Sequence, residues 1–308
     1  MKTTIIVNPT AGNGKSLKRW EKFKGKLDFT YDLHMTSSPK HATALASECV
    51  QDGESQLLIA FGGDGTAHEV IEGVLDCPNC IVGVIGAGSA NDFGRGFPSF
   101  QHPEEVNKYV HSLGNSNEMD IGYVVTQHQH FTFVNNAGIG FDAYVAYQVN
   151  KSKVKKMLNK FSLGKLAYTY FVMKTLVTFK HFTLTVECPT HSQTFEKVWF
   201  ATISNQPYFG GGMKISPQSN PADGEIEITL VHHLSRIKLL LLFASVFFGK
   251  HTSFKEVHQM SSTTFKLTTN ESVYRHTDGE YANQTSPHIA DEFTVQSKKW
   301  KIASIIAP

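Results

Sequence analysis

Three glycine-rich segments in the first third of the chain carry residues of the kind that bind phosphate and a cation. The most informative is Gly62-Gly63-Asp64-Gly65-Thr66, which follows an apolar stretch and precedes a helix-like one. Glycines let a backbone approach a ligand closely, and N–H groups at the start of a helix attract phosphate. Asp64 would repel a phosphate unless a cation lay between them, so the segment predicts a phosphate site with a bound cation. The alternative is a glycine-rich turn between a strand and a helix, without a ligand.

The other two segments lie on either side of this one in the sequence. Residues 8–16 end like a P-loop, but Pro9 stands where that motif needs its first glycine. The motif therefore fails, and a phosphate-facing loop and a plain turn stay equally open. Residues 86–92 have Asn91 where a dinucleotide fingerprint needs a third glycine. This segment adds Asp92, which would be a second carboxylate near Asp64 if the loops converge.

Two pairs of carboxylates later in the chain could bind a cation or move a proton. In Asp278-Gly279-Glu280 the acids are two residues apart, and in an extended segment such residues point the same way. Paired acids can hold Mg²⁺, and one of them can serve as a general base. Taken alone, a hairpin turn is the favoured interpretation of this Asp-Gly pair, and a plain turn is favoured for Asp223-Gly224-Glu225.

The elements that must position these residues change in character along the chain. Three continuous apolar runs are predicted as strands buried on both faces, and the segments between them are typical of helices. This alternation predicts a parallel sheet whose carboxyl edge carries the glycine-rich loops, the edge where ligands bind in such folds. The predicted strands are residues 3–7, 57–61 and 81–85, and the predicted helices are residues 15–27, 42–50, 66–75 and 104–113.

The chain after about residue 124 alternates apolar and polar residues instead. Such alternation predicts antiparallel strands with one wet face, here over residues 182–187, 226–230, 265–268 and 293–296. Helices are expected over residues 164–177 and 235–248. Residues 135–143 imitate a dinucleotide fingerprint, but close packing of the backbone is the favoured interpretation. The expected architecture is an α/β domain followed by a β-rich domain.

Whole-chain composition narrows the class of protein. The 308 residues carry 29 Lys and Arg against 27 Asp and Glu, a net charge of +2, which argues against a general nucleic-acid-binding protein. Residues 239–248, the most apolar stretch, are half the roughly 20 residues that a membrane span requires. With four Cys and no signal peptide, a soluble, reduced, cytoplasmic protein is expected. Six lysines between residues 151 and 165 are either a solvated face or a patch for an anionic membrane.

These motifs, in this order, resemble the diacylglycerol kinase catalytic-domain family, and most of all its soluble bacterial lipid kinases, relatives of sphingosine and ceramide kinases. The resemblance spans nearly the whole chain, and its motifs are Asn8-Pro9, Gly62–Thr66, Gly88–Asp92, Gly210–Met213, Asp223-Gly224 and Asp278–Glu280. It implies a nucleotide-binding α/β domain of residues 1–124 with a returning segment, residues 291–308. A β-rich, sandwich-like lipid-substrate domain of residues 125–290 would follow, with the active site in the cleft between the two.

The resemblance also implies an activity and assigns roles to residues. The activity is ATP-dependent transfer of the γ-phosphate to a lipid hydroxyl, with diacylglycerol or a related glycerolipid as the favoured acceptor. Glu280 matches the general base, while Asp64, Asp92 and Asp278 match an acidic network that holds Mg²⁺ partly through water. A separate structural Mg²⁺ site matches Asn220, Asp223 and Glu225, with backbone oxygens from the first and last. The nucleotide would contact Asn8, Pro9, Thr10, Ala11, Gly12, Thr36, Gly62, Gly63, Asp64, Gly65, Thr66, Ala67, His68 and Ser89.

Two residues depart from the family pattern, and two other functions remain alternatives. His68 replaces the usual Asn, which affects a local hydrogen bond, and Ser89 replaces the usual Thr but keeps the hydroxyl. The alternatives are an NAD kinase and a non-catalytic lipid-binding protein on a kinase scaffold. For the favoured function the partners are a lipid substrate and the anionic inner face of a membrane, with no nucleic acid, and the resemblance suggests a homodimer. The apolar residues 239–248, with other Phe-rich surroundings, are expected to receive acyl chains.

Overall fold

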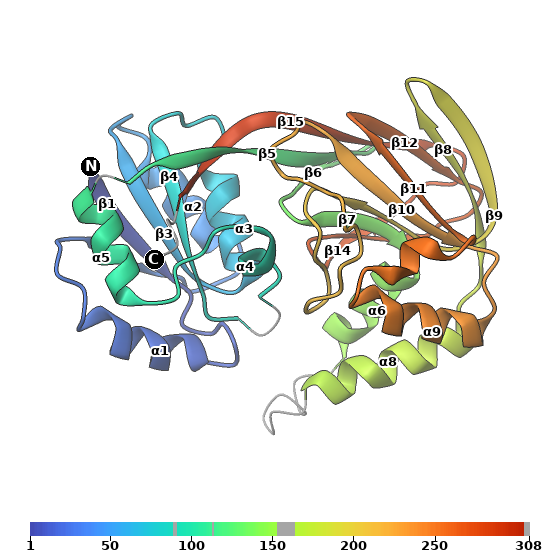
Figure 1. Cartoon of the computed structure of the whole chain (residues 1–308), viewed down its shortest axis with the longest axis horizontal. Coiled ribbons are helices and arrows are strands. Elements are labelled where there is room, and N and C mark those ends of the chain that lie inside the picture. The colour runs from blue at the N-terminus through green and yellow to red at the C-terminus, as the bar shows by residue number, and fades with distance from the viewer. Residues whose placement is uncertain (89–90, 113, 153–163, 305–308) are drawn as a thin grey trace. The chain divides into compact units, whose positions relative to one another are not determined.

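The computed structural model describes residues 1–88, 91–112, 114–152 and 164–304. It divides into two compact units (Figure 1). Unit 1 comprises residues 1–121 and the chain from Ser297 on, and unit 2 comprises residues 122–296. Two strands, β5 (Ser116–Val125) and β15 (Ala290–Ala303), have residues in both units.

Unit 1 is an α/β structure built on a parallel sheet. Its strands lie in the order β15-β4-β3-β1-β2, and every pairing among them is parallel. The strands are β1 (Lys2–Val7), β2 (Asp32–Met35), β3 (Gln56–Gly62) and β4 (Cys80–Gly86), joined by the end of β15. The helices are α1 (Lys15–Lys24), α2 (His41–Cys49), α3 (Asp64–Gly73), α4 (Phe93–Gly96) and α5 (Pro103–Ser112).

The apolar strands of unit 1 are buried on both faces, as their sequence predicts. All seven residues of β3 are buried, because helices cover the sheet on each side. Trp20 of α1 and Tyr109 of α5 pack on the face that carries Ile5 and Ile59, while α2 and α3 pack against each other and against β1 and β3. The edge strand β2 was not predicted from the sequence, since its short polar run, which is mostly exposed, has no apolar signal.

Unit 2 is dominated by antiparallel strands, as the alternating sequence predicts. The ladder runs β14-β13-β7-β9-β8-β12-β15, and β10 pairs with β9 and β11. Its strands besides β5 and β15 are β6 (His130–Phe133), β7 (Asn136–Gly140), β8 (Phe182–Cys188), β9 (His191–Ser204), β10 (Ile226–His232), β11 (Val257–Ser262), β12 (Thr264–Thr269), β13 (Tyr274–Thr277) and β14 (Glu280–Gln284). Its helices are α6 (Phe141–Lys151), α8 (Gly164–Thr178) and α9 (Arg236–Val246), with a short 3₁₀ helix η1 (Lys250–Ser253).

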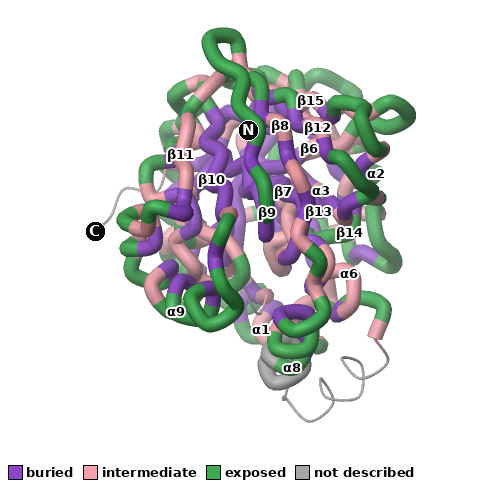
Figure 2. The backbone as a smooth tube through the Cα atoms, turned by 90° about the vertical axis from the view of Figure 1, so that its right-hand side faces the viewer, coloured by how far each residue is buried: buried purple, intermediate pink, exposed green. Residues whose placement is uncertain are grey.

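Two apolar clusters stabilise unit 2. Many of the buried residues of this unit lie in its strands (Figure 2). One cluster lies among the inward residues of the strands, including Phe133, Leu184, Ile228 and Phe265. The other joins α6, α8 and α9 to strand residues such as Trp199. The expected fold class, an α/β domain with a parallel sheet and a β-rich, sandwich-like domain, is therefore confirmed. Among the described residues, no helix is long and apolar enough to cross a membrane.

Candidate active site

Asn8 joins two of the predicted loops at the carboxyl edge of the unit 1 sheet. Its side-chain amide nitrogen donates to Thr66 Oγ1 at 3.0 Å, so the loop after β1 is tied to the first turn of α3. Its amide oxygen accepts from the N–H of Thr10 at 3.1 Å and from the Thr10 hydroxyl at 2.9 Å. Thr36 lies at the same edge, where its N–H donates to the carbonyl oxygen of Val7. Residues that follow β1, β2 and β3 therefore meet at one edge.

Glycines bring the same loops into contact. A Cβ added at Gly88 would lie 2.6 Å from Gly63 Cα, and one added at Gly12, which has φ +59°, would lie 2.6 Å from the carbonyl oxygen of Ala87. A Cβ at Gly62 would lie 2.4 Å from Thr66 Oγ1. Side chains at these positions would separate the loops. Their absence leaves only backbone around the N-terminus of α3, where the N–H groups of Thr66 and Ala67 both donate to the carbonyl oxygen of Gly63.

This arrangement fits a phosphate chain, because exposed N–H groups at a helix N-terminus favour negative charge. Ala67 is buried in α3, Gly65 is exposed, and His68 is half-buried in the next position. Pro9 and Ala11 belong to the loop after β1 and are half-buried. Ser89 lies outside the described residues. The nucleotide contacts assigned to all these residues stay predictions.

Two carboxylates lie beside the loops. Asp64 begins α3, and its Oδ1 accepts from the N–H of Phe93 at 2.9 Å, which ties α3 to the start of α4. Asp92 is only 7% exposed and forms an ion pair with Arg95 at 3.2 Å. Within the described residues no three Asp, Glu, His or Cys side chains group closely enough to hold a metal ion alone. Carboxylates of this kind are oxygen ligands that Mg²⁺ accepts together with phosphate and water, and Mg²⁺ binding at Asp64 and Asp92 stays a prediction.

In unit 2, Asp278 and Gly279 form the two-residue turn between β13 and β14. Their φ angles are +47° and +80°, and Thr277 pairs with Glu280 across the turn. The segment is therefore a turn and is not extended. The expectation that an extended backbone points both acids the same way is wrong. The Asp278 carboxylate accepts from the N–H groups of three successive residues at 2.9 Å each, namely Val134, Asn135 and Asn136. Glu280 is exposed.

A buried His–Asp pair supports this turn and was not found by sequence reasoning. His276 Nδ1 accepts from the N–H of Gly279 at 3.4 Å, so its Nε2 carries the proton and donates to Asp142 Oδ2 at 3.1 Å. Thr202 donates to the same carboxylate oxygen at 3.0 Å, and the ring of Phe209 stacks on His276 at 5.0 Å. His276 is fully buried, so its contacts hold the turn that carries Glu280. The only sequence signal was that Asp142 belongs to the glycine motif of residues 135–143.

We expect His276→Ala to lower the rate of the reaction more than the affinity for nucleotide. The turn would lose its support, and a misplacement of about 1 Å at a reacting group can cost about a hundredfold in rate. The measurement is kcat and KM for nucleotide at a temperature well below the unfolding midpoint, with His276→Gln as the conservative variant and the exposed His191→Ala as the control. An unchanged kcat in His276→Ala would show that the pair has only a structural role.

The residues of the predicted structural metal site lie in a turn before β10. The carbonyl oxygen of Asn220 accepts from the N–H of Asp223 at 3.4 Å, and Asp223 Oδ1 accepts from the N–H of Glu225 at 3.0 Å. Two residues on, Glu227 is 7% exposed, and its buried carboxylate forms a hydrogen bond with the Ser219 hydroxyl. Burial raises the pKa of Glu227, this hydrogen bond lowers it, and the charges of the other two acids raise it further. Among the described residues these three acids do not group closely enough to hold a metal ion by themselves, so the metal site of Asn220, Asp223 and Glu225 stays a prediction.

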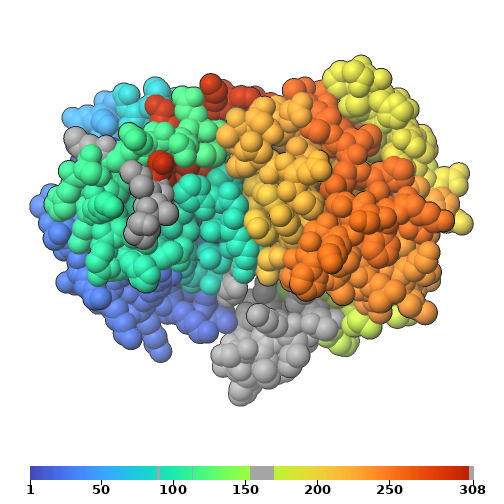
Figure 3. Space-filling model, in the orientation of Figure 1, coloured from blue at the N-terminus to red at the C-terminus, as the bar shows by residue number. Residues whose placement is uncertain are grey.

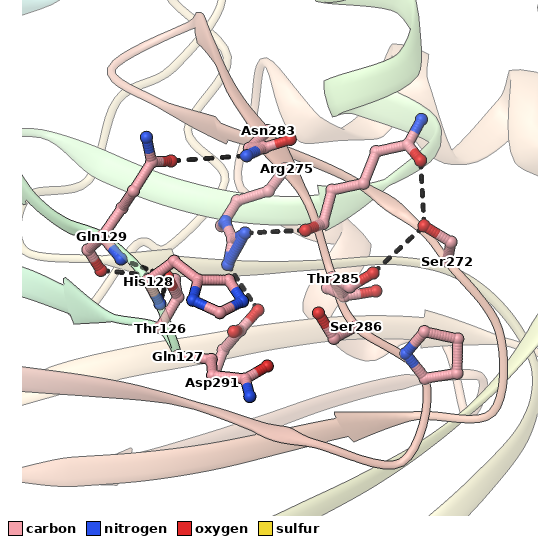
Figure 4. A pocket seen from close by; sticks show the side chains of 12 residues that line it. Thr126, Gln127, His128, Gln129, Ser272, Arg275, Asn283, Thr285, Ser286 and Asp291 are labelled. Atoms are coloured by element: carbon pink, nitrogen blue, oxygen red, sulfur yellow. Dashed lines mark hydrogen bonds and ion pairs between the residues drawn. The ribbon is translucent and has the colours of Figure 1, made fainter.

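Unit 2 also contains a polar recess of about 310 Å³ (Figure 4). At its base Arg275 forms a buried ion pair with Asp291 and also donates to the backbone oxygens of Ala282 and Gln284. Burial lowers the pKa of Arg275 and raises that of Asp291, while their mutual attraction opposes both shifts. The lining of the recess is polar and does not suit acyl chains. The recess is lined by Thr126, Gln127, His128, Gln129, Ser272, Arg275, Asn283, Gln284, Thr285, Ser286, Pro287 and Asp291.

The predicted catalytic residues are thus divided between the units. Asp64 and Asp92 belong to unit 1 and lie beside the glycine loops, whereas Asp278 and Glu280 belong to unit 2 and share one hairpin. The structure brings together the members of each pair. Their catalytic roles and the assembly of all four into one site stay predictions.

Comparison with known proteins identifies the family. Residues 2–124 match the diacylglycerol kinase catalytic domain, and residues 135–296 match the YegS C-terminal NAD kinase beta sandwich-like domain. A candidate lipid kinase of Bacillus subtilis, YtlR, is 31% identical over 294 residues, which cover 93% of this chain and 95% of that protein. A diacylglycerol kinase of the same organism is 29% identical over 288 residues, covering 90% of this chain and 89% of that protein.

A solved structure shows the same fold. The crystal structure of a candidate diacylglycerol kinase from Bacillus anthracis aligns over 100% of this chain and 97% of its own, with a TM-score of 0.72 and 21% identity. Family matches cover both units, and the relatives match over nearly their full lengths. The chain belongs to the diacylglycerol kinase family and is a lipid kinase.

Proposed function

We propose that this kinase transfers the γ-phosphate of ATP to a hydroxyl of diacylglycerol or a related glycerolipid, giving phosphatidic acid or an analogue. The observation that carries the proposal is the glycine cradle at the N-terminus of α3, flanked by Asp64 and Asp92. The site of action is the anionic inner face of the cytoplasmic membrane. Phosphoryl transfer depends mostly on positioning and on neutralising charge, which is what such a cradle supplies.

Each group in the proposed site has one task. Backbone N–H groups at Gly63 and Gly65 hold the phosphates of ATP, while Asp64 and Asp92 hold Mg²⁺. When bound, Mg²⁺ offsets negative charge on the phosphates. Glu280 accepts the proton of the lipid hydroxyl as that oxygen bonds to the γ-phosphorus and the bond from phosphorus to ADP breaks. Asp278 and His276 hold the turn, so that Glu280 keeps a fixed position.

The test of the substrate class is incubation of the whole protein with γ-labelled ATP, Mg²⁺ and total bacterial membrane lipid. We expect label in a chloroform-soluble product that comigrates with phosphatidic acid, and none in a parallel reaction with NAD as the acceptor. Label in NADP with none in lipid would instead support the NAD kinase alternative. ATP consumption that lipid does not stimulate would contradict the proposal.

We also propose Mg²⁺ binding at Asn220, Asp223 and Glu225, and Glu227 provides a test of it. A buried carboxylate costs more free energy than a buried amide of the same size, so in EDTA Glu227→Gln should unfold at a higher temperature than wild type. Mg²⁺ should stabilise the wild type and have a smaller effect on the variant. Thermal unfolding with and without Mg²⁺ measures both effects, with the exposed Glu187→Gln as the control. Equal responses of wild type and variant to Mg²⁺ would count against a cation at this turn.

A further inference from the structure

Helix α9 is apolar on two opposite sides, but the core of unit 2 covers only one of them. Leu239, Leu242 and Val246 are fully buried in the cluster beneath the helix. On the other side Ile237 is 75% exposed and Leu241 60%. Positions 237, 241, 244 and 248 are spaced three and four apart, so they share one helical stripe that faces away from the core. A surface helix normally carries polar residues on that side.

The exposed apolar surface continues beyond α9. Phe247 and Phe248, which follow the helix directly, are 54% and 78% exposed. The neighbouring helix α8 exposes Tyr170, Met173 and Val177, which also lie on one stripe.

The two helices are adjacent, because Arg236 in the first turn of α9 donates to the carbonyl oxygen of Leu176 in α8 at 2.9 Å. The orange segment that contains α9 lies on the surface of unit 2 (Figure 3). We call the exposed residues Tyr170, Met173, Val177, Ile237, Leu240, Leu241, Phe247 and Phe248 the α8–α9 face.

The sequence around this face is free of acidic residues. Between Asp142 and Glu187 there is no Asp or Glu, and the lysines of this segment whose side chains the structure describes are Lys151, Lys174 and Lys180; most of the predicted lysine run of residues 151–165 lies outside the described residues. Between Glu227 and Glu256 there is again no acid, while Arg236, Lys238, Lys250 and Lys255 are present. Glu256 itself pairs with Lys238 at 3.1 Å. The chain as a whole is nearly neutral, so basic charge is concentrated in the two segments that supply the α8–α9 face.

We propose that the α8–α9 face docks on an anionic lipid bilayer, with Ile237, Leu241 and Phe248 inserted among the acyl chains and the basic residues at the headgroups. The proposal deepens the proposed function, since it names the surface by which the kinase reaches a lipid substrate. Apolar residues on one side of a helix with Lys and Arg around them are typical of helices that lie in a membrane interface. Lys and Arg near an anionic leaflet add attraction. A second copy of this chain would present the same basic charge and would be repelled.

The test uses the full-length protein and vesicles, and needs no turnover. Flotation with phosphatidylglycerol–phosphatidylcholine vesicles is compared with flotation on phosphatidylcholine alone. The variant Leu241→Glu/Phe248→Glu is compared with Leu33→Glu/Ile289→Glu, which introduces the same charge at residues 42% and 40% exposed on β2 and before β15. We expect binding of the wild type to the anionic vesicles only, weakened by salt. The Leu241→Glu/Phe248→Glu variant should bind at least about tenfold more weakly than the wild type, and the Leu33→Glu/Ile289→Glu variant should bind like the wild type.

A fluorescent variant locates the face directly. Trp20, Trp199 and Trp300 are at most 2% exposed, so Phe248→Trp adds a single surface reporter. Its emission should shift to the blue on anionic vesicles and be quenched by brominated lipid, whereas Ile289→Trp should show neither change.

The outcomes separate this proposal from the proposed function. The docking surface is overturned if both double variants float equally and the emission of Phe248→Trp does not shift. It is also overturned if the wild type does not float with the vesicles. The wild type could instead form a dimer and not bind lipid. If only the Leu241→Glu/Phe248→Glu variant loses that dimer, the face binds a second copy of the chain, and the membrane-docking proposal is overturned. Flotation as expected without phosphorylation of any lipid overturns the proposed function alone. Normal phosphorylation of a short-chain, monodisperse acceptor without flotation overturns the docking surface alone.

Discussion

Replacing Glu280 by Gln is expected to lower kcat for lipid phosphorylation by about 10²–10⁴ and to leave the affinity for ATP unchanged. Glutamine has nearly the same size but cannot accept the proton of the hydroxyl. Glu280 is exposed on the β13–β14 hairpin and is not among the residues predicted to contact the nucleotide, so nucleotide binding should not depend on it. Initial rates of phosphate transfer and equilibrium binding of a fluorescent ATP analogue measure the two quantities.

The control for this variant is Glu271→Gln, which removes another exposed carboxylate of unit 2 and should leave the rate unchanged. Turnover by Glu280→Gln within a few-fold of the wild type would show that Glu280 is not the base. A parallel loss of ATP affinity and rate would assign it to nucleotide binding instead.

The second large effect is expected for Asp64→Asn, which should lower kcat by about 10²–10³ and raise the Mg²⁺ concentration that gives half-maximal rate. The substitution removes the charge that would hold the cation. It keeps an Oδ1 atom that can accept from the N–H of Phe93, so the free energy of unfolding should change little. Rates over a Mg²⁺ titration, together with thermal unfolding, separate the two effects.

Asp52→Asn is the matched control for Asp64→Asn. Asp52 Oδ1 likewise accepts from a backbone N–H, that of Glu54 at 3.1 Å, but Asp52 lies in an exposed turn away from the glycine loops. Equal rates and equal Mg²⁺ dependence for Asp64→Asn and the wild type would exclude Asp64 from cation binding.

The sequence predicted the fold well where burial leaves a periodic signal. Strands β1, β3 and β4 of the parallel sheet are buried on both faces, and their apolar and β-branched runs identified them. Alternation identified β8 and β12, which bury one face each. It also identified β10, but the wet face expected there is wrong, because β10 is buried on both faces. The edge strand β2 and the short hairpin strand β14 have exposed, polar residues and lack that signal. Their pairing depends on neighbours distant in sequence, which local patterns do not reveal.

The candidate site was predictable only in part. The glycine loops are local motifs, and the structure brings them together at one sheet edge. The contacts of Asp278 with backbone N–H groups some 140 residues away, and the pair of His276 with Asp142, are long-range. Their partners come from different strands and have no fixed spacing, so a single sequence does not predict them. The glycine motif of residues 135–143 does show the expected close packing, since a Cβ at Gly138 would lie 2.8 Å from His276 Nε2.

We propose that Asp64 and Glu280, from different units, act on one phosphoryl transfer, and a double-mutant cycle distinguishes this from independent action. The measurement is kcat/KM for lipid in Asp64→Asn, Glu280→Gln and the double variant. Groups that act on the same step give strongly non-additive losses, so the double variant should be little slower than the slower single variant. If the two losses instead multiply in full, as they do for independent sites, the two residues do not share a site and the account is contradicted.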